Sequence, residues 1–475
     1  MKPSLPAYDR SKLTPGIVHI GLGNFHRAHM AVYLDDLFAK GLGHDWAILG
    51  AGVREGDARM REALKAQDCL STVIELDPQG KSARRIGSMI DFLPVDPDNA
   101  SLIAAMSRPE IRIVSLTVTE GGYFIDPATG RFDPKAPEIA HDGANPGKPV
   151  TAFGAIVAAL KARKIVGTPP FTVMSCDNLP GNGHVTKAAV VGTARLSDPA
   201  LASWIEDNVA FPNGMVDRIT PATGPREREM AASFGLTDPV PVTCEPFRQW
   251  VLEDTFPQGR PPLQEVGVTL TPHVHAFEMM KIRILNGGHA TIAYPGGLMD
   301  IEYVHEAMAH PLILGFLNKV ETEEIIPYVP PVPDTNIADY YRLIVQRFSN
   351  PEVADTERRL CLDGSNRQPK FIIPSVRDAL AAGGRIDGLA LVSALWCRYC
   401  FGVTDSGRHI PPNDPNWDYL QAQSKAAKDA PVVWLQMKPI YGDLNKDVRF
   451  VAAFTKALNA LWDKGTAAVL KDYIG

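Results

Sequence analysis

The chain has 475 residues, of which 45% are hydrophobic and 21% charged, and its formal net charge is −6. This length predicts two or three domains that each bury a full core, and the composition is that of an ordinary globular protein. The sequence has no run of Lys and Arg, no apolar stretch long enough to span a bilayer and no secretory signal at its N-terminus. We therefore expect a cytoplasmic protein with neither nucleic acid nor membrane as a partner.

Apolar runs that end in turn residues alternate with helical patterns in the first 200 residues. This alternation predicts an α/β fold, with an open, doubly wound parallel sheet and helices on both faces. The expected strands lie in the segments 16–23 and 112–123, which end in glycine turns, in 46–53 and 71–76, and in 170–183, which continues as a polar loop. The expected helices are 25–41 and 151–164.

The composition changes near residue 270. Residues 211–221 and 239–254 read as strand and turn pieces that extend the first domain, whereas later segments have the apolar periodicity of helices. We therefore expect a first domain over 1–272 and a mainly α-helical second domain over 273–475.

The first expected strand runs into the turn Gly21-Leu22-Gly23-Asn24-Phe25-His26. A turn of this kind before a helix suits a dinucleotide pyrophosphate, because Gly21 permits a tight turn and Gly23 permits close approach of the backbone. His26 replaces the third glycine of G-x-G-x-x-G, which weakens the motif. His26 and Arg27 either contribute to the phosphate site or have only a structural role at the helix start.

Acidic residues follow the second expected strand, in the segment Arg54-Glu55-Gly56-Asp57. Either Asp57 or Glu55 can accept hydrogen bonds from the ribose hydroxyls of NAD and disfavour a 2′-phosphate. Arg54 offers the opposite interpretation, because an arginine at this place accommodates NADP. A solvated loop without a ligand is the third possibility.

Polar residues also follow the two later strands of the expected sheet. Glu120 ends one apolar strand, and Ser175, Asp177 and Asn178 end the next. The carboxyl ends of parallel strands face the ligand in such a sheet, so these residues are candidates for its site.

Residues 278–289, EMMKIRILNGGH, place an acid, a lysine, an amide and an imidazole among apolar side chains. On an α-helix, Glu278, His289 and Asn286 fall at about 60°, 80° and 140° from Lys281, on one arc. Burial would push the pKa of a lysine down, towards that of a base. The stretch is either a catalytic face or the solvated side of an amphipathic helix.

Neither a disulfide framework nor a metal site is expected. The six cysteines are sparse, and Cys397 and Cys400 lie in an apolar run typical of a core helix. His305 and His310 are five residues apart, about 140° around an α-helix, so they would not bind one zinc ion.

The pattern Lys281-x-x-x-x-Asn286-x-x-His289 resembles the active-site motif of the polyol-specific long-chain dehydrogenases, the mannitol 2-dehydrogenase family. The resemblance extends over most of the chain, through the segments 21–29, 111–123, 171–183, 211–221 and 244–254. It implies a Rossmann-type N-terminal domain, a mainly α-helical C-terminal domain, a nicotinamide cofactor and no zinc.

The resemblance also implies roles for individual residues. Lys281 is similar to the general base of the family, and Glu278 would pass its proton to water. Asn178 and Asn286 resemble the amides that stabilise the reacting oxygen, and His289 the residue that orients the substrate. The remaining implied positions are Arg359 and Asp217 for the polyol chain, and Gly21, Gly23, Phe25, Asp57 and Glu120 for NAD.

One departure concerns the ribose site, where Gly56 precedes Asp57 in place of an expected pair of acids. A single acid still favours NAD over NADP, with looser discrimination.

The resulting hypothesis is reversible, NAD-dependent oxidation of D-mannitol to D-fructose, with D-arabinitol to D-xylulose and D-sorbitol as further activities. A uronate reductase of the same superfamily, acting on fructuronate or tagaturonate, is the alternative, because Arg359 could bind a carboxylate. A nucleotide-binding sensor without turnover is a more remote one, since it has no need of Lys281, Asn286 and Asn178 together. The sequence leaves the oligomeric state open.

Overall fold

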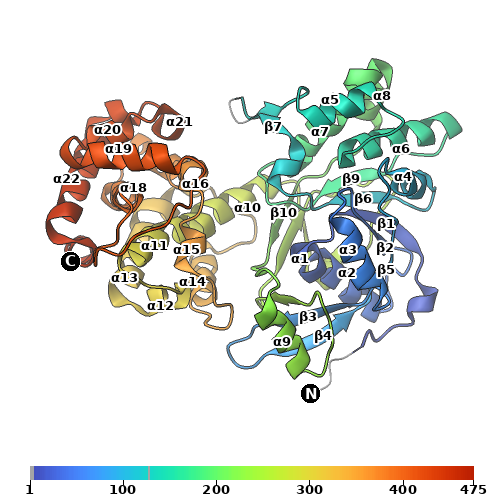
Figure 1. Ribbon diagram of the computed structural model, residues 1–475, viewed down its shortest axis with the longest axis horizontal. Coiled ribbons are helices and arrows are strands. Elements are labelled where there is room, and N and C mark those ends of the chain that lie inside the picture. Colours follow the sequence, from blue (N-terminus) through green and yellow to red (C-terminus); the bar gives the residue numbers. More distant parts are fainter. Residues whose placement is uncertain (1–4, 127–128) are drawn as a thin grey trace. The chain divides into compact units, whose positions relative to one another are not determined.

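The computed structural model describes residues 5–126 and 129–475. The contacts within the chain define two compact units, Met1–His275 and Ala276–Gly475, close to the division expected after residue 272. Unit 1 contains the sheets and unit 2 is mainly helical (Figure 1). The expected fold class, a Rossmann-type first domain and a mainly α-helical second domain, is confirmed.

A five-stranded parallel sheet forms the centre of unit 1, in the order β5-β2-β1-β6-β9. Ile20 pairs with Leu116, and Leu116 pairs with Ser175, so β1, β6 and β9 end level with one another. The loops that follow these three strands therefore begin at one edge of the sheet. The strands are β1 (Pro15–Ile20), β2 (Ala47–Ala51), β5 (Met89–Phe92), β6 (Ile113–Leu116) and β9 (Thr172–Ser175).

Helices cover both faces of this sheet (Figure 1). Successive side chains of a strand point to opposite faces, so Ile17 packs with α2 whereas Val18 packs with α4 and α6. Both faces are consequently buried in apolar cores. The helices of unit 1 are α1 (Asn24–Ala28), α2 (Met30–Ala39), α3 (Asp57–Lys65), α4 (Ala100–Ser107), α5 (Pro137–Ala144), α6 (Ala152–Val166), α7 (Asn182–Ser197), α8 (Pro199–Asn208) and α9 (Pro225–Ser233), with short 3-10 turns at Arg10–Lys12, Glu120–Tyr123 and Leu263–Val266.

Several features of unit 1 differ from the sequence expectation, among them the edge strand β5, which lies outside every expected strand. The helix expected over 25–41 is interrupted at His29, whose φ of −118° and ψ of −93° are not helical, so that α1 and α2 are separate. The strand expected over 71–76 forms, but it belongs to a small second sheet of order β11-β3-β4. The remaining strands are β3 (Ser71–Glu75), β4 (Ser82–Ile86), β7 (Ile125–Asp126), β8 (Arg131–Phe132), β10 (Gly214–Asp217), β11 (Val242–Cys244), β12 (Gln249–Leu252) and β13 (Thr269–Leu270).

Helix α18 (Asp387–Cys400) lies in the core of unit 2 and packs against α22 (Val448–Lys464). Cys397 and Cys400 lie on it as buried, free thiols, which confirms the prediction of a core helix. The other helices are α10 (Val274–Met280), α11 (Gly287–Leu298), α12 (Val304–Ala309), α13 (Pro311–Val320), α14 (Ile337–Phe348), α15 (Glu357–Leu360), α16 (Gly364–Phe371), α17 (Ile373–Ala381), α19 (Trp417–Asp429), α20 (Val432–Leu435), α21 (Lys438–Tyr441) and α23 (Thr466–Ile474), with π-turns at Lys281–Asn286 and Glu321–Ile325 and 3-10 turns at Ile326–Tyr328 and Leu444–Lys446.

In the described part of the chain, no helix combines the length and the apolar character that crossing a membrane requires. The cytoplasmic location stays a prediction.

Candidate functional site

The glycine turn expected between the first strand and the first helix lies between β1 and α1. Gly21 has a φ of +97°, and a Cβ atom there would lie 2.1 Å from the Thr117 carbonyl oxygen. Gly23, directly before α1, has nothing within 4 Å of its Cβ position. Gly21 is therefore required by the fold itself, whereas Gly23 leaves an open approach to the start of the helix.

Hydrogen bonds from two neighbouring strands fix this turn. The carbonyl of Gly21 accepts a 2.5 Å hydrogen bond from the Thr117 hydroxyl and lies 3.0 Å from His19 Nε2. His19 Nδ1 lies 2.8 Å from Ser115 Oγ. Burial lowers the pKa of His19 to about 3, so the imidazole is neutral. Phe25 stacks on His29 at the other end of α1.

His26, which occupies the place of a third glycine, points into the core. Its ring stacks on His19 with a centroid separation of 3.4 Å and is 1% exposed. Burial, followed by the charge contributions of His19, Arg27 and His29, lowers its pKa well below the usual value. The helix and strand therefore pack through two neutral imidazoles, which favours the structural interpretation of His26.

Arg27 is also buried and serves the fold. It donates a 2.9 Å hydrogen bond to the side-chain oxygen of Asn24 and another to the carbonyl of Val240. Asn24 in turn donates to the Pro221 carbonyl and to the Thr223 hydroxyl. These bonds tie the loop at 221–223 to the glycine turn.

Asp57 is the first residue of α3 and supports the turn that precedes it. Its Oδ2 accepts hydrogen bonds from the backbone amides of Val53 (3.0 Å) and Arg54 (2.9 Å). Glu55 and Arg54 are exposed. Of the two acids, Asp57 is the one held in a fixed position by the backbone.

The polar residues after β6 and β9 come together because these strands are paired and end level. Glu120 begins the 3-10 turn Glu120–Tyr123 after β6, and Asp177 and Asn178 follow β9. Asp217 is the last residue of β10 and is buried. Unit 1 thus contains all the predicted cofactor residues together with Asn178 and Asp217.

The stretch 278–289 of unit 2 departs from the regular α-helix assumed for it. Glu278 lies on α10, Lys281–Asn286 form a π-turn, and His289 lies on α11. The Gly287 amide donates to the carbonyl of Ile282, five residues earlier, as a π-helix requires. The angle of about 140° between Lys281 and Asn286 was therefore wrong, because five residues make roughly one turn of a π-helix.

The π-turn places the four polar groups on one face. Lys281 follows Glu278 by three residues in the helix, Asn286 follows Lys281 by one π-turn, and His289 follows Asn286 by three residues. Glu278 and Lys281 are only 5% and 6% exposed. The interpretation as a solvated amphipathic face is therefore wrong.

His289 is held by stacking on Phe348, with ring centroids 4.2 Å apart. Burial lowers its pKa well below the usual value, and the positive charges of Arg359, Arg347 and Arg367 act in the same direction. The imidazole is consequently neutral. Its Nε2 has no hydrogen-bond partner among the described residues, so that this atom offers a polar contact.

Arg359 of α15 is half-exposed and forms an ion pair with Asp355. Its Nε donates a 2.5 Å hydrogen bond to Asp355 Oδ1, and a terminal nitrogen donates to Oδ2. Unit 2 thus contains Arg359 together with Glu278, Lys281, Asn286 and His289.

Two buried acids next to α11 were not predicted from the sequence. Glu321 and Glu357 are at most 1% exposed, and none of their carboxyl oxygens has a hydrogen-bond partner within the described ranges. Glu321 Oε1 lies 3.3 Å from the Cβ position of Gly288, and Glu357 packs on Gly296. Burial raises both pKa values well above the usual value, so these acids are neutral. Nothing in the sequence separates Glu321 from its neighbour Glu323, which is exposed.

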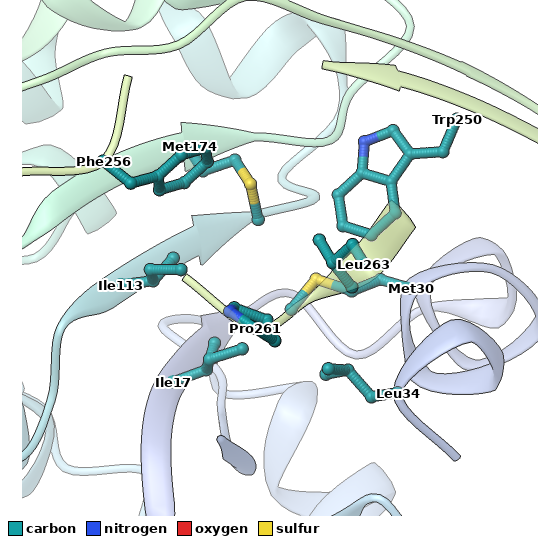
Figure 2. Close-up of a pocket in the computed structure, with 9 residues that line it drawn as sticks. All are labelled: Ile17, Met30, Leu34, Ile113, Met174, Trp250, Phe256, Pro261 and Leu263. Carbon is teal, nitrogen blue, oxygen red and sulfur yellow. The ribbon is translucent and has the colours of Figure 1, made fainter. Parts of the chain in front are cut away.

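Other candidate sites have weaker support. His305 lies on α12 and His310 beyond its end, and the described residues include no group of three or more His, Cys, Asp or Glu side chains placed to hold a metal ion. Figure 2 shows a cavity in the core of unit 1 whose lining is apolar and which therefore suits no hydroxyl-rich ligand. Its lining residues are Ile17, Met30, Leu34, Ile113, Met174, Trp250, Phe256, Pro261 and Leu263.

Comparison with known proteins gives consistent results. Residues 15–265 match the model of the mannitol dehydrogenase Rossmann domain, and residues 273–462 that of the mannitol dehydrogenase C-terminal domain. Mannitol 2-dehydrogenase from Cereibacter sphaeroides is 70% identical over 469 residues, which cover 99% of this chain and 98% of the relative.

Two solved structures resemble the chain over its whole length. The Pseudomonas fluorescens mannitol 2-dehydrogenase in ternary complex with NAD and D-mannitol is 42% identical, with a TM-score of 0.88 over 100% of this chain and 97% of that one. A D-sorbitol dehydrogenase in substrate-free form is 36% identical, with a TM-score of 0.92 over 99% and 97% of the two chains.

We expect Gly21→Ala and Gly23→Ala to affect different properties. Gly21→Ala places a methyl group against the Thr117 carbonyl and forces Ala to a positive φ, which alone costs about 1–3 kcal/mol. It should lower both the melting temperature and the affinity for NADH. Gly23→Ala should weaken NADH binding at an unchanged melting temperature. Calorimetry and fluorescence titration test this, and a normal affinity of Gly23→Ala for NADH would contradict it.

We expect Glu321→Gln to remove a pH-dependent loss of stability. The pKa of Glu321 is raised in the folded state, so folding retains a proton that the unfolded chain releases above about pH 4.3. The contribution of Glu321 is thus complete below that pH and declines as pH rises towards its folded pKa. The melting temperature of Glu321→Gln relative to the wild type should therefore increase from pH 5 to pH 8.

Glu323→Gln is the matched control in the same π-turn, because Glu323 is exposed and paired with Arg385. Its difference from the wild type should stay nearly constant over this pH range. If the difference in melting temperature between Glu321→Gln and the wild type also stays constant over this pH range, the buried acid ionises freely.

Proposed function

The chain belongs to the mannitol dehydrogenase family, and from this premise we propose that it catalyses the reversible, NAD-dependent oxidation of D-mannitol to D-fructose. The observation that carries the proposal is the π-turn, which spaces Lys281 and Asn286 one π-turn apart, with Glu278 and Lys281 buried and Asn286 and His289 half-buried. The 70% identity to a mannitol 2-dehydrogenase over nearly the whole chain supports the substrate.

The glycine turn fits the pyrophosphate of NAD. Gly23 has open space at its Cβ position, and α1 begins directly after it, so backbone amides are available to an anion. We assign Gly21, Gly23, Phe25 and Glu120 to cofactor binding and Asp57 to the ribose hydroxyls, through the oxygen that does not hold the backbone. When bound there, NAD would supply the acceptor for the hydride of the carbinol carbon.

Lys281 is the proposed general base. Its amine must be neutral to take the proton of the substrate hydroxyl, and its side chain lies in a buried place, with Lys281 only 6% exposed. Glu278 lies three residues earlier on the same face and would pass the proton on to water. In this proposal the proton acceptor is a lysine, and no zinc takes part.

Asn178 and Asn286 are the proposed donors to the reacting oxygen. Their amide N–H groups stabilise the negative charge that develops as the hydroxyl loses its proton. His289 is neutral and orients a neighbouring hydroxyl, since an uncharged imidazole can donate or accept a hydrogen bond. Asp217 and Arg359 would bind the rest of the polyol chain.

The ion pair of Arg359 with Asp355 favours a polyol over a uronate substrate. A carboxylate already occupies two donors of this arginine, so the cation is partly neutralised before any substrate arrives. D-Sorbitol and D-arabinitol are proposed as further substrates, and the similarity to a D-sorbitol dehydrogenase supports the first of them.

The experiment that tests this function follows NADH absorbance after addition of either D-fructose or D-fructuronate. We expect NADH oxidation with D-fructose and little with D-fructuronate. The opposite result would assign the chain to the uronate reductases, and NADH binding without oxidation of either would indicate a sensor.

We expect Asn286→Ala to lower kcat for D-mannitol oxidation by about 10²–10³-fold, as loss of an oxyanion donor does elsewhere. The KM for NAD should change little, because no cofactor residue is altered. Asn208→Ala, which removes an amide that donates to the Trp204 carbonyl of its own helix, is the control and should retain full turnover. An effect of Asn286→Ala confined to the KM for D-mannitol would contradict the role of oxyanion donor.

A further inference from the structure

The carboxylate of Asp177 joins the loop after β9 to the loop after β6. Its Oδ2 accepts hydrogen bonds from the Val118 amide (2.9 Å) and the Tyr123 hydroxyl (2.7 Å), and its Oδ1 accepts one from the Thr119 amide (3.0 Å). The side chain is 9% exposed. Three donors thus converge on one buried side chain where the two strands end.

The loop that Asp177 holds has an unfavourable backbone conformation. Thr119 has a φ of 66° and a ψ of 164°, a region that is almost confined to glycine. A β-branched residue is especially unsuited to it. The hydrogen bonds of Asp177 to Val118 and Thr119 are therefore part of what keeps this loop in place.

The residues on either side of these bonds belong to the proposed site. Thr119 directly precedes Glu120, which we assign to the cofactor, and Asp177 directly precedes Asn178, which we assign to the reacting oxygen. A shift of one loop relative to the other would consequently move a cofactor residue relative to a catalytic one.

Asn182 fixes the backbone of Asp177 from the other side. Its amide donates to the Asp177 carbonyl (3.2 Å) and to the Gly214 carbonyl (2.8 Å), and its Oδ1 accepts from the Gly214 amide (2.9 Å). Asn182 is fully buried, and Gly214 begins β10, which ends at Asp217. The segments leading to Glu120, Asn178 and Asp217 are therefore connected by buried hydrogen bonds.

We propose that Asp177 is a positioning residue, which sets the place of Glu120 relative to Asn178 by holding Thr119 in its strained conformation. This inference rests on the proposed function for the roles of Glu120 and Asn178. Asp177 itself touches neither substrate nor cofactor in this account.

The test compares Asp177→Asn with the wild type in the full-length enzyme. The amide has the size of the carboxylate but only one acceptor oxygen, so it cannot serve both backbone amides and the Tyr123 hydroxyl. We expect the dissociation constant of NADH to rise by about tenfold and kcat for D-mannitol to fall by about 10–100-fold, as small misplacements of reacting groups do.

Asp142→Asn is the matched control. Asp142 is also buried and also accepts from two consecutive backbone amides, Val150 and Thr151, and from the Thr151 hydroxyl. Asp142→Asn should lower the melting temperature but leave NADH affinity and kcat unchanged. Equal kinetic losses in both variants would overturn the proposal, because they would reflect general destabilisation.

Thr119→Gly provides a rescue, because glycine adopts the required backbone angles without the carboxylate. In the Asp177→Asn background it should restore most of the NADH affinity. If Asp177→Asn alone does not fold, the NADH affinity of this double variant is measured in its place. The proposal is overturned if Asp177→Asn binds NADH and turns over like the wild type. It is also overturned if adding Thr119→Gly to Asp177→Asn restores the melting temperature but not the affinity for NADH.

Measurements of NADH binding distinguish a failure of this inference from a failure of the proposed function. A wild-type enzyme that binds NADH but oxidises no polyol would contradict the proposed function, whereas the affinities of the Asp177 variants would still decide whether Asp177 positions the loop.

Discussion

Hydrogen bonds between buried polar groups hold the carboxyl edge of the parallel sheet, and the candidate site in unit 1 depends on them. β1, β6 and β9 end level, so Gly21, Thr117 and Asp177 lie at one edge. Unpaired polar groups would be costly in such a buried place. The Thr117 hydroxyl donates to the Gly21 carbonyl, and the Thr119 amide donates to the Asp177 carboxylate, so these buried polar groups are paired. The same hydrogen bonds hold the loops in place.

The π-turn of unit 2 determines which polar residues lie on the same face of the helix. Residues five apart lie on different sides of an α-helix but about one turn apart in a π-helix. The local change from α to π therefore aligns Lys281 with Asn286, while the flanking α-helical segments add Glu278 and His289. Glu321 and Glu357 lie beside this helix, and burial raises the pKa of both, so they bring no negative charge to it.

The sequence was sufficient for four of the five strands of the main sheet, but it predicted neither the edge strand β5 nor the geometry of the candidate site. Apolar runs predicted β1, β2, β6 and β9 because a strand buried on both faces must be apolar throughout. The same signal placed β3 in the main sheet wrongly, since periodicity does not identify the partner of a strand. The π-turn and the break at His29 have no sequence signature, because both depend on tertiary packing. The connection made by Asp177 was missed for the same reason.

The central claim is that the buried amine of Lys281 accepts the proton of the substrate. Chemical rescue of Lys281→Ala tests this most directly, by measuring D-mannitol oxidation with NAD while methylamine or ethylamine is added. Our account predicts that Lys281→Ala binds NADH normally, is nearly inactive alone, and recovers activity in proportion to the concentration of the neutral amine. Full activity of Lys281→Ala at neutral pH without any amine would contradict the assignment of Lys281 as the base.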